Sequence, residues 1–156
     1  MRNMRFAAAI FMSALLTACS SAPGPGATAA APPPAVNDNS PMLPLTARTA
    51  TAVVPNHLLG FSKLPGGTVG DYESGGRKYQ LFIIETPSNQ DAALMLMDAK
   101  AGMRDTELIP WMGGYFGTDG TRPIYVFPKL KYLAGVVGLP KDDADPIARV
   151  LAARLK

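Results

Sequence analysis

A short apolar run near the start of the chain, residues 6–16, separates the first part of the sequence from any folded domain. The run follows two basic residues, Arg2 and Arg5. It is too short to span a bilayer, which takes about 20 residues. A basic start, a brief apolar core and small residues at its end are typical of an export signal. We therefore expect residues 1–18 to be a cleaved signal peptide.

The signal ends in the tetrapeptide Leu16-Thr17-Ala18-Cys19. This tetrapeptide resembles the lipobox of bacterial lipoproteins, which reads Leu, a small or hydroxyl residue, Gly or Ala, and then Cys. The resemblance implies that the thiol of Cys19 receives a diacylglyceryl group, that the chain is cut before it, and that the new amine is acylated, as with palmitate. Because two anchoring signals already make membrane attachment stable, the resemblance implies a lipid-anchored protein.

Cys19 is the only cysteine of the chain. A lone thiol is unusual in an oxidising compartment, and lipidation would consume it. The alternatives are a secreted protein with a spare thiol and a short anchor that is not cleaved. In the enterobacterial sorting pattern, Asp after the cysteine retains a lipoprotein at the inner membrane. Since Ser20 stands there instead, we expect attachment to the outer membrane, facing the periplasm.

The charge of the processed chain argues against a nucleic-acid partner. The whole chain has 15 Lys and Arg against 12 Asp and Glu, a net charge of +3. Cleavage removes two of the basic residues, Arg2 and Arg5, which takes the net charge from +3 to +1. Non-specific nucleic-acid binding depends on dense positive charge, so we expect none.

Residues 19–46 form a segment of low complexity. Glycine, alanine and short polar residues surround its seven prolines, which are Pro23, Pro25, Pro32, Pro33, Pro34, Pro41 and Pro44. Such a segment buries too little apolar surface to offset the entropy of ordering it. We expect a disordered tether over 19–46 that carries the lipid on Cys19. The remaining residues, 47–156, have the usual size of one globular domain.

Apolar segments separated by turn residues predict an α+β domain. Strands are expected over 68–73, 78–86, 113–116, 121–127 and 131–138, while 50–54 and 58–64 are either strands or irregular lead-in. Gly75-Gly76 and Asp119-Gly120 suit tight hairpin turns. We therefore predict a small, mostly antiparallel sheet of about five strands, packed by two helices.

Capping residues indicate where the two helices begin. Ser88 is the expected N-cap of the first, which runs to about residue 103. Its expected apolar face consists of Ala92, Leu96, Ala99 and Met103, widened by Leu94 and Met97. Asp145 is the expected N-cap of the second helix, with Pro146 at its first position. The expected buried stripe of this helix is Ile147, Val150, Leu151 and Leu155.

A strand, a proline and a helix follow one another twice along the chain. The motif residues Tyr79, Ile83, Ile84 and Pro87 recur 53 positions later as Tyr132, Val136, Val137 and Pro140. One explanation is that any two strand–helix junctions look alike. The other is a resemblance to the sporulation-related repeat (SPOR), a peptidoglycan-binding domain made of two strand–helix halves. That resemblance implies cell-wall binding by residues 79–156.

No residue pattern points to catalysis. His57, the only histidine, lies in a turn-like stretch where a surface role is expected. Glu85, near the end of an apolar strand, is the one acid whose surroundings could raise its pKa. The acids Asp142, Asp143 and Asp145 lack the spacing of a calcium-binding EF-hand loop and suit a helix start. One cysteine and one histidine are too few for a zinc site. We expect no metal, no cofactor and no enzymatic activity.

Aromatic side chains around the Asp119-Gly120 turn are the candidate binding residues. They are Trp111, Tyr115 and Tyr125. Strand alternation would expose some of them, and exposed aromatics favour contact with a ligand or partner; core packing is the alternative. The leading hypothesis is a lipid-anchored, non-enzymatic binding or accessory subunit of the cell envelope, with an envelope protein or peptidoglycan as its partner. A peptidoglycan-binding domain is the alternative, and an envelope hydrolase using Glu85 or the acids at 142–145 is a third.

Overall fold

The computed structural model describes residues 35–156, so the expected signal peptide, Cys19 and the expected tether up to residue 34 lie outside the described residues. Strands and helices follow one another in a simple order. They are η1 (Ser40–Met42), β1 (Arg48–Asn56), η2 (Leu58–Gly60), β2 (Pro65–Ser74), β3 (Arg77–Glu85), α1 (Asn89–Ala101), β4 (Arg104–Ile109), β5 (Gly114–Thr118), β6 (Pro123–Lys129), β7 (Tyr132–Val137) and α2 (Lys141–Arg154).

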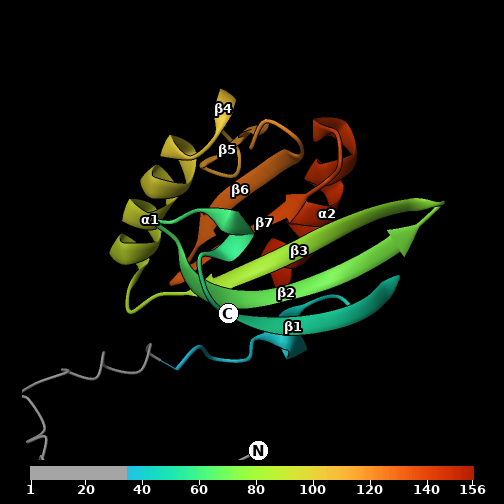
Figure 1. Cartoon of the computed structure of the whole chain (residues 1–156), viewed down its shortest axis with the longest axis horizontal. Helices are drawn as coiled ribbons and strands as arrows, with labels where there is room; N and C mark the ends of the chain where they lie inside the picture. Colours follow the sequence, from blue (N-terminus) through green and yellow to red (C-terminus); the bar gives the residue numbers. More distant parts are fainter. Residues whose placement is uncertain (1–34) are drawn as a thin grey trace, which may run out of the picture. The chain divides into compact units, whose positions relative to one another are not determined.

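The strands form one antiparallel sheet in the order β1-β2-β3-β7-β6-β5-β4 (Figure 1). The α+β class and the antiparallel sheet are confirmed. The predicted strand number of about five is wrong, because the described residues contain seven. The sequence of β4 is charged and exposed on both faces, so it has no apolar alternation to detect. Residues 58–60 form the short turn η2 instead of a strand.

Each face of the sheet is covered by one helix, and side chains alternate between the two faces. Phe82 and Ile84 of β3 pack with Leu96 of α1 on one side, which we call the α1 face. Leu81 and Ile83 of the same strand pack against α2, on the α2 face. Figure 1 shows the two helices well apart, α1 in olive and α2 in red, with the sheet between them.

Helix α1 begins as expected. The side chain of Ser88 accepts a hydrogen bond from the backbone N–H of Asp91 at 3.1 Å, which confirms the N-cap. The expected apolar stripe is buried as well. Two of its predicted members are wrong, however, since Leu94 and Met97 point to solvent. The helix contacts the sheet through the buried residues Ala92, Leu96 and Ala99.

Helix α2 begins one turn earlier than expected. Its N-cap position is Pro140, so Asp145 is not a cap and Pro146 lies inside the helix. The additional turn buries Ala144 completely, which extends the stripe that continues through Ala148 and Leu151. Pro146 removes one backbone hydrogen bond of the helix, while the burial of Ala144 stabilises the additional turn.

The folded part also begins earlier than the predicted boundary at Ala47. Residues 37–46, which we call the strap, lie on the α2 face, where Leu43 is fully buried in the core. The backbone N–H of Asn39 donates to Thr68 Oγ1 at 2.9 Å. At the other side, the guanidinium of Arg154 donates to the carbonyl oxygens of Met42 and Pro41. The last part of the expected tether is therefore packed structure.

Candidate binding groove beside helix α2

The three aromatic residues singled out from the sequence do not form one surface. Trp111 lies in the turn between β4 and β5 and is 55% exposed. Tyr125 of β6 is fully buried on the α2 face, so the expectation that its ring could meet a ligand is wrong. Tyr115 packs on the α1 face, where the ammonium of Lys100 lies 4.3 Å from its ring centre.

Trp111 and Tyr125 meet instead at one carboxylate. The indole N–H of Trp111 and the hydroxyl of Tyr125 both donate to Asp145 Oδ1, at 2.7 Å and 2.6 Å. Arg149, one turn further along α2, donates to Oδ2 at 2.8 Å. Burial alone would raise the pKa of Asp145, but hydrogen bonds from Tyr125, Arg149 and Trp111 outweigh it and lower the pKa to about 2. This acid therefore fixes α2 to the sheet rather than capping the helix.

A groove lies on the other side of α2, between the helix, the strap and the β2–β3 hairpin. We call it the α2 groove; its volume is about 430 Å³, within the range of ligand sites. Its apolar surface comes from Pro44, Tyr79, Leu81, Leu139, Ile147 and Val150. In Figure 1 the β2–β3 hairpin extends past α2.

Turn chemistry and aromatic packing shape the hairpin wall of the α2 groove. Gly75 and Gly76 have φ values of +59° and +75°, which confirms the predicted turn. Behind the turn, the rings of Tyr72 and Tyr79 stack with centres 5.2 Å apart. The hydroxyl of Tyr72 donates to the carbonyl of Pro44 at 2.7 Å, and burial raises the pKa of Tyr72 to about 12. This bond joins the hairpin to the strap.

The charged groups that line the α2 groove neutralise each other. Arg77 at the end of the hairpin forms an ion pair with Asp143 in the first turn of α2. No other Lys, Arg, Asp or Glu among the described residues lines the groove. The groove therefore suits an uncharged, apolar occupant.

Ile147 and Val150 were predicted to be core residues, and the sequence did not separate them from the true core. The sheet is covered by Ala144, Ala148 and Leu151, which leaves Ile147 half-buried and Val150 exposed at the side of the helix. The apolar stripe of α2 in the sequence is wider than the strip of the helix that the sheet covers. That excess indicates a surface beside the core.

Glu85, one of the acids of the hydrolase hypothesis, forms an ion pair. Lys131 Nζ lies 2.6 Å from Glu85 Oε1, and Asn37 Nδ2 donates to Oε2 at 3.0 Å. Hydrogen bonds from Lys131 and Asn37 lower the pKa of Glu85, so the expectation that its surroundings raise the pKa is wrong. This contact fastens the strap at the end of β3. His57 lies exposed in the turn before η2, at φ +50°.

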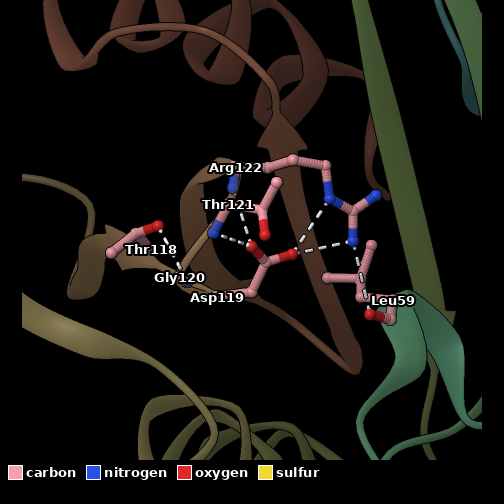
Figure 2. A network of polar contacts seen from close by, with 6 residues as sticks. All are labelled: Leu59, Thr118, Asp119, Gly120, Thr121 and Arg122. Atoms are coloured by element: carbon pink, nitrogen blue, oxygen red, sulfur yellow. Dashed lines mark hydrogen bonds and ion pairs between the residues drawn. The ribbon is translucent and has the colours of Figure 1, made fainter.

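A second carboxylate network organises the turn between β5 and β6 (Figure 2). Asp119 accepts hydrogen bonds from the backbone N–H groups of Thr121 and Arg122 at 2.9 Å and 2.7 Å, and from Arg122 Nε at 2.9 Å. The same guanidinium donates to the carbonyl of Leu59 at 3.4 Å. Burial alone would raise the pKa of Asp119, but these donors lower it. The network joins this turn to η2 and has a structural role.

Residues 35–156 contain no cluster of three or more His, Cys, Asp or Glu side chains able to hold a metal ion. Within the same part of the chain, every buried polar side-chain atom has a hydrogen-bond partner. Comparison with known proteins gave no match: no family model, no curated protein and no solved structure is significantly similar to this chain.

Proposed function

We propose that this protein is a lipid-anchored lipoprotein of the outer membrane that acts in the periplasm as a non-enzymatic binding or accessory subunit. The observation that carries the proposal is the tetrapeptide Leu16-Thr17-Ala18-Cys19 behind a short apolar run, followed by a proline-rich segment and one packed domain. No helix of the described residues is long and apolar enough to cross a membrane. The lipid on Cys19 is the proposed anchor.

A binding role is supported by how the acids of the domain are used. Glu85 pairs with Lys131, Asp143 with Arg77, and Asp145 holds Trp111 and Tyr125. A general acid or base must reach the proton that it transfers and have a pKa near the working pH. These carboxylates are engaged in contacts between elements, which favours the binding role over the hydrolase hypothesis.

The partner surface that we propose is the α2 groove, and the occupant is an uncharged, apolar segment of an envelope protein. The argument rests on the lining, in which Tyr79, Ile147 and Val150 are accessible while Arg77 and Asp143 neutralise each other. An apolar segment of the partner would gain about 25 cal/mol for each Å² of apolar surface removed from water. A charged segment would meet no unpaired charge of opposite sign in the groove.

The anchor is tested first, by growing cells with an alkyne analogue of palmitate. Wild-type protein is expected to carry the label and to sediment with outer membranes, because Cys19 supplies the only thiol. Cys19→Ala is expected to lose the label. Under the sorting pattern stated above, Ser20→Asp is expected to keep the label but move to the inner membrane. Unlabelled wild-type protein, or equal labelling of Cys19→Ala, would contradict the lipoprotein proposal.

The groove is tested by site-specific photo-crosslinking in cells. A photoreactive residue at Val150 is compared with one at Leu94, since these apolar helix positions are similarly exposed, at 54% and 61%, but lie on opposite helices. Discrete adducts are expected from Val150 only, and Ile147→Glu in the groove should abolish them. Equal adducts from both positions, or none from Val150, would contradict the groove as the partner surface.

Cell-wall binding stays the second candidate. The repeated units that suggested it are β3–α1 and β7–α2, and β3 and β7 pair at the centre of the sheet, although their helices lie on opposite faces. Purified sacculi and the fragment 35–156, which includes the strap, provide the test. Saturable co-sedimentation that resists salt would support peptidoglycan as the partner. A fragment that stays in the supernatant would rule this candidate out.

A further inference from the structure

Among residues 35–156, no other strand pairs with the outer edge of strand β1. β1 runs over Arg48–Asn56 and pairs with β2 on one side only. Seven of its nine residues are exposed. Both helices pack over the β6 and β7 part of the sheet, away from this edge. A row of backbone N–H and C=O groups on an edge strand is a template for another strand.

The opposite edge of the sheet shows how this chain protects a strand from pairing. Strand β4 is short, at six residues, and carries the charged residues Arg104, Asp105 and Glu107. Its pairing is interrupted by an irregularity between Arg104 and Glu107, and Asp105 has a left-handed φ of +52°. Charge, shortness and a bulge are the usual means of blocking an edge. β1 is longer. It has an irregularity between Arg48 and Ala50 and a proline at position 55, but its stretch 50–54 contains no charge, no proline and no bulge.

We propose that β1 pairs edge to edge with β1 of a second copy of this chain, antiparallel and centred on Ala52. This arrangement has two-fold symmetry, as most homodimers do. It places Ala52 opposite Ala52 of the second copy, Thr51 opposite Val53, and Ala50 opposite Val54. Paired residues of antiparallel strands lie on the same face. Residues 50–54 alternate regularly against β2, so these pairs meet that condition, and the irregularity between Arg48 and Ala50 ends the regular stretch on one side.

Charge and side-chain size favour a second copy as the occupant. Arg48 is the only charged residue of β1, and it lies outside the regular stretch 50–54. The two copies of Arg48 stand about 27 Å apart, at eight residues of about 3.4 Å each. No like charges therefore meet across the interface. The central side chains are Ala, Thr and Val, which suit close strand packing without shape conflict.

The strength of this contact depends on where the chain is held. Pairing of one strand buries less than the roughly 1,200 Å² of a standard stable interface, so the dimer is weak in dilute solution. Confinement of both copies to one membrane raises their effective concentration. At the same protein concentration, we therefore expect the membrane-anchored chain to dimerise and a soluble fragment to stay monomeric.

The test is cysteine crosslinking of the full chain in cells, with a mild oxidant. Ala52→Cys is expected to give a disulfide-linked dimer, because opposed Cβ atoms of paired strands lie about 4.5–5.5 Å apart. Asn56→Cys is the matched control on the same strand. It is expected to give at least tenfold less dimer, since its two copies are about 27 Å apart in the proposed register. Crosslinking is measured in both the membrane and the soluble fraction. Sedimentation reports separately whether the chain is attached to the membrane.

A second pair of variants tests the register without cysteine. Ala52→Lys sets like charges directly opposite each other and should reduce co-isolation of two differently tagged copies several-fold. Ala52→Thr should preserve it, and both exposed substitutions should leave the thermal unfolding of the monomer unchanged. The proposal is overturned by equal dimer yields from Ala52→Cys and Asn56→Cys, by no dimer from Ala52→Cys, or by an adduct with a different protein only.

Discussion

The hydroxyl of Tyr125, buried in the centre of the α2 face, donates to Asp145 Oδ1 at 2.6 Å and so ties β6 to the second turn of α2. The two partners are not equivalent, because Tyr125 is buried while the side chain of Asp145 is 22% exposed. Asp145→Ala leaves a buried hydroxyl without its acceptor, which costs about 1–3 kcal/mol. Tyr125→Phe removes the donor and leaves Asp145 its other partners, so we expect a loss of about 1 kcal/mol or less. Urea unfolding of both variants measures the difference, and a larger loss for Tyr125→Phe would contradict this account.

The same acid predicts how stability depends on pH. The pKa of Asp145 is lowered to about 2 from an ordinary value of 3.8, so the native state favours the ionised form. Its contribution to the free energy of unfolding is complete above about pH 4 and is lost as the pH falls toward about 2. Asp145→Asn removes this ionisation. The stability difference between wild type and Asp145→Asn should shrink between about pH 4 and pH 2, and a constant difference would show that the carboxylate is not stabilised in the native state.

The strap provides a matched pair of leucines. Leu43 is fully buried and Leu45, two residues on, is 72% exposed. Leu43→Ala should cost about 2–5 kcal/mol because it leaves a cavity in the core. Leu45→Ala should change the free energy of unfolding by less than about 0.5 kcal/mol. Chemical denaturation distinguishes the two results. A negligible effect of Leu43→Ala would show that residues 37–46 do not belong to the packed domain.

Gly135 in β7 is required by a close approach of the backbone rather than by an unusual φ. A Cβ atom added there would lie 2.2 Å from the carbonyl oxygen of Tyr125 and 2.7 Å from the ring of Phe82. A backbone oxygen cannot rotate away, so Gly135→Ala should cost about 3 kcal/mol or more. Gly60→Ala is the control, since its Cβ would meet nothing within 4 Å and only its φ of +83° is strained. That strain costs about 1–2 kcal/mol. In thermal unfolding, Gly135→Ala should have a clearly lower Tm than Gly60→Ala.

Local patterns in the sequence sufficed for the parts of the fold that carry strong alternation. The apolar strand around Phe82, the glycine pair at the hairpin and the cap at Ser88 each predict their element, and together they predict an antiparallel α+β domain. β4 escaped detection because a solvated edge strand needs no apolar face. The start of α2 was misplaced because Asp145-Pro146 has the chemistry of a helix start, whereas tertiary burial of Ala144 extends the helix beyond it.

The candidate site was harder to predict, because it depends on contacts between distant segments. Composition marks residues 37–46 as tether, yet Leu43 finds space over Gly70, whose lack of a side chain makes room for it. The sequence places Trp111 and Tyr125 near one turn, but only the three-dimensional structure shows that both donate to Asp145 and that Tyr125 is buried. The α2 groove is formed by the strap, the β2–β3 hairpin and α2, which are distant in the sequence. The periodicity of any one segment therefore does not predict it.

The strap also decides how the domain bears mechanical force. A pull on the chain before Asn37 acts first on the strap, whose bonds lead to Glu85, Thr68 and Arg154. These residues belong to β3, β2 and the last turn of α2, so tension is shared among elements that are far apart in the sequence. Without the strap, the same pull would act directly on β1, which is held by β2 alone and would peel away one hydrogen bond at a time. The strap therefore helps the domain stay folded when force acts on the chain before Asn37, the side on which the proposed lipid anchor lies.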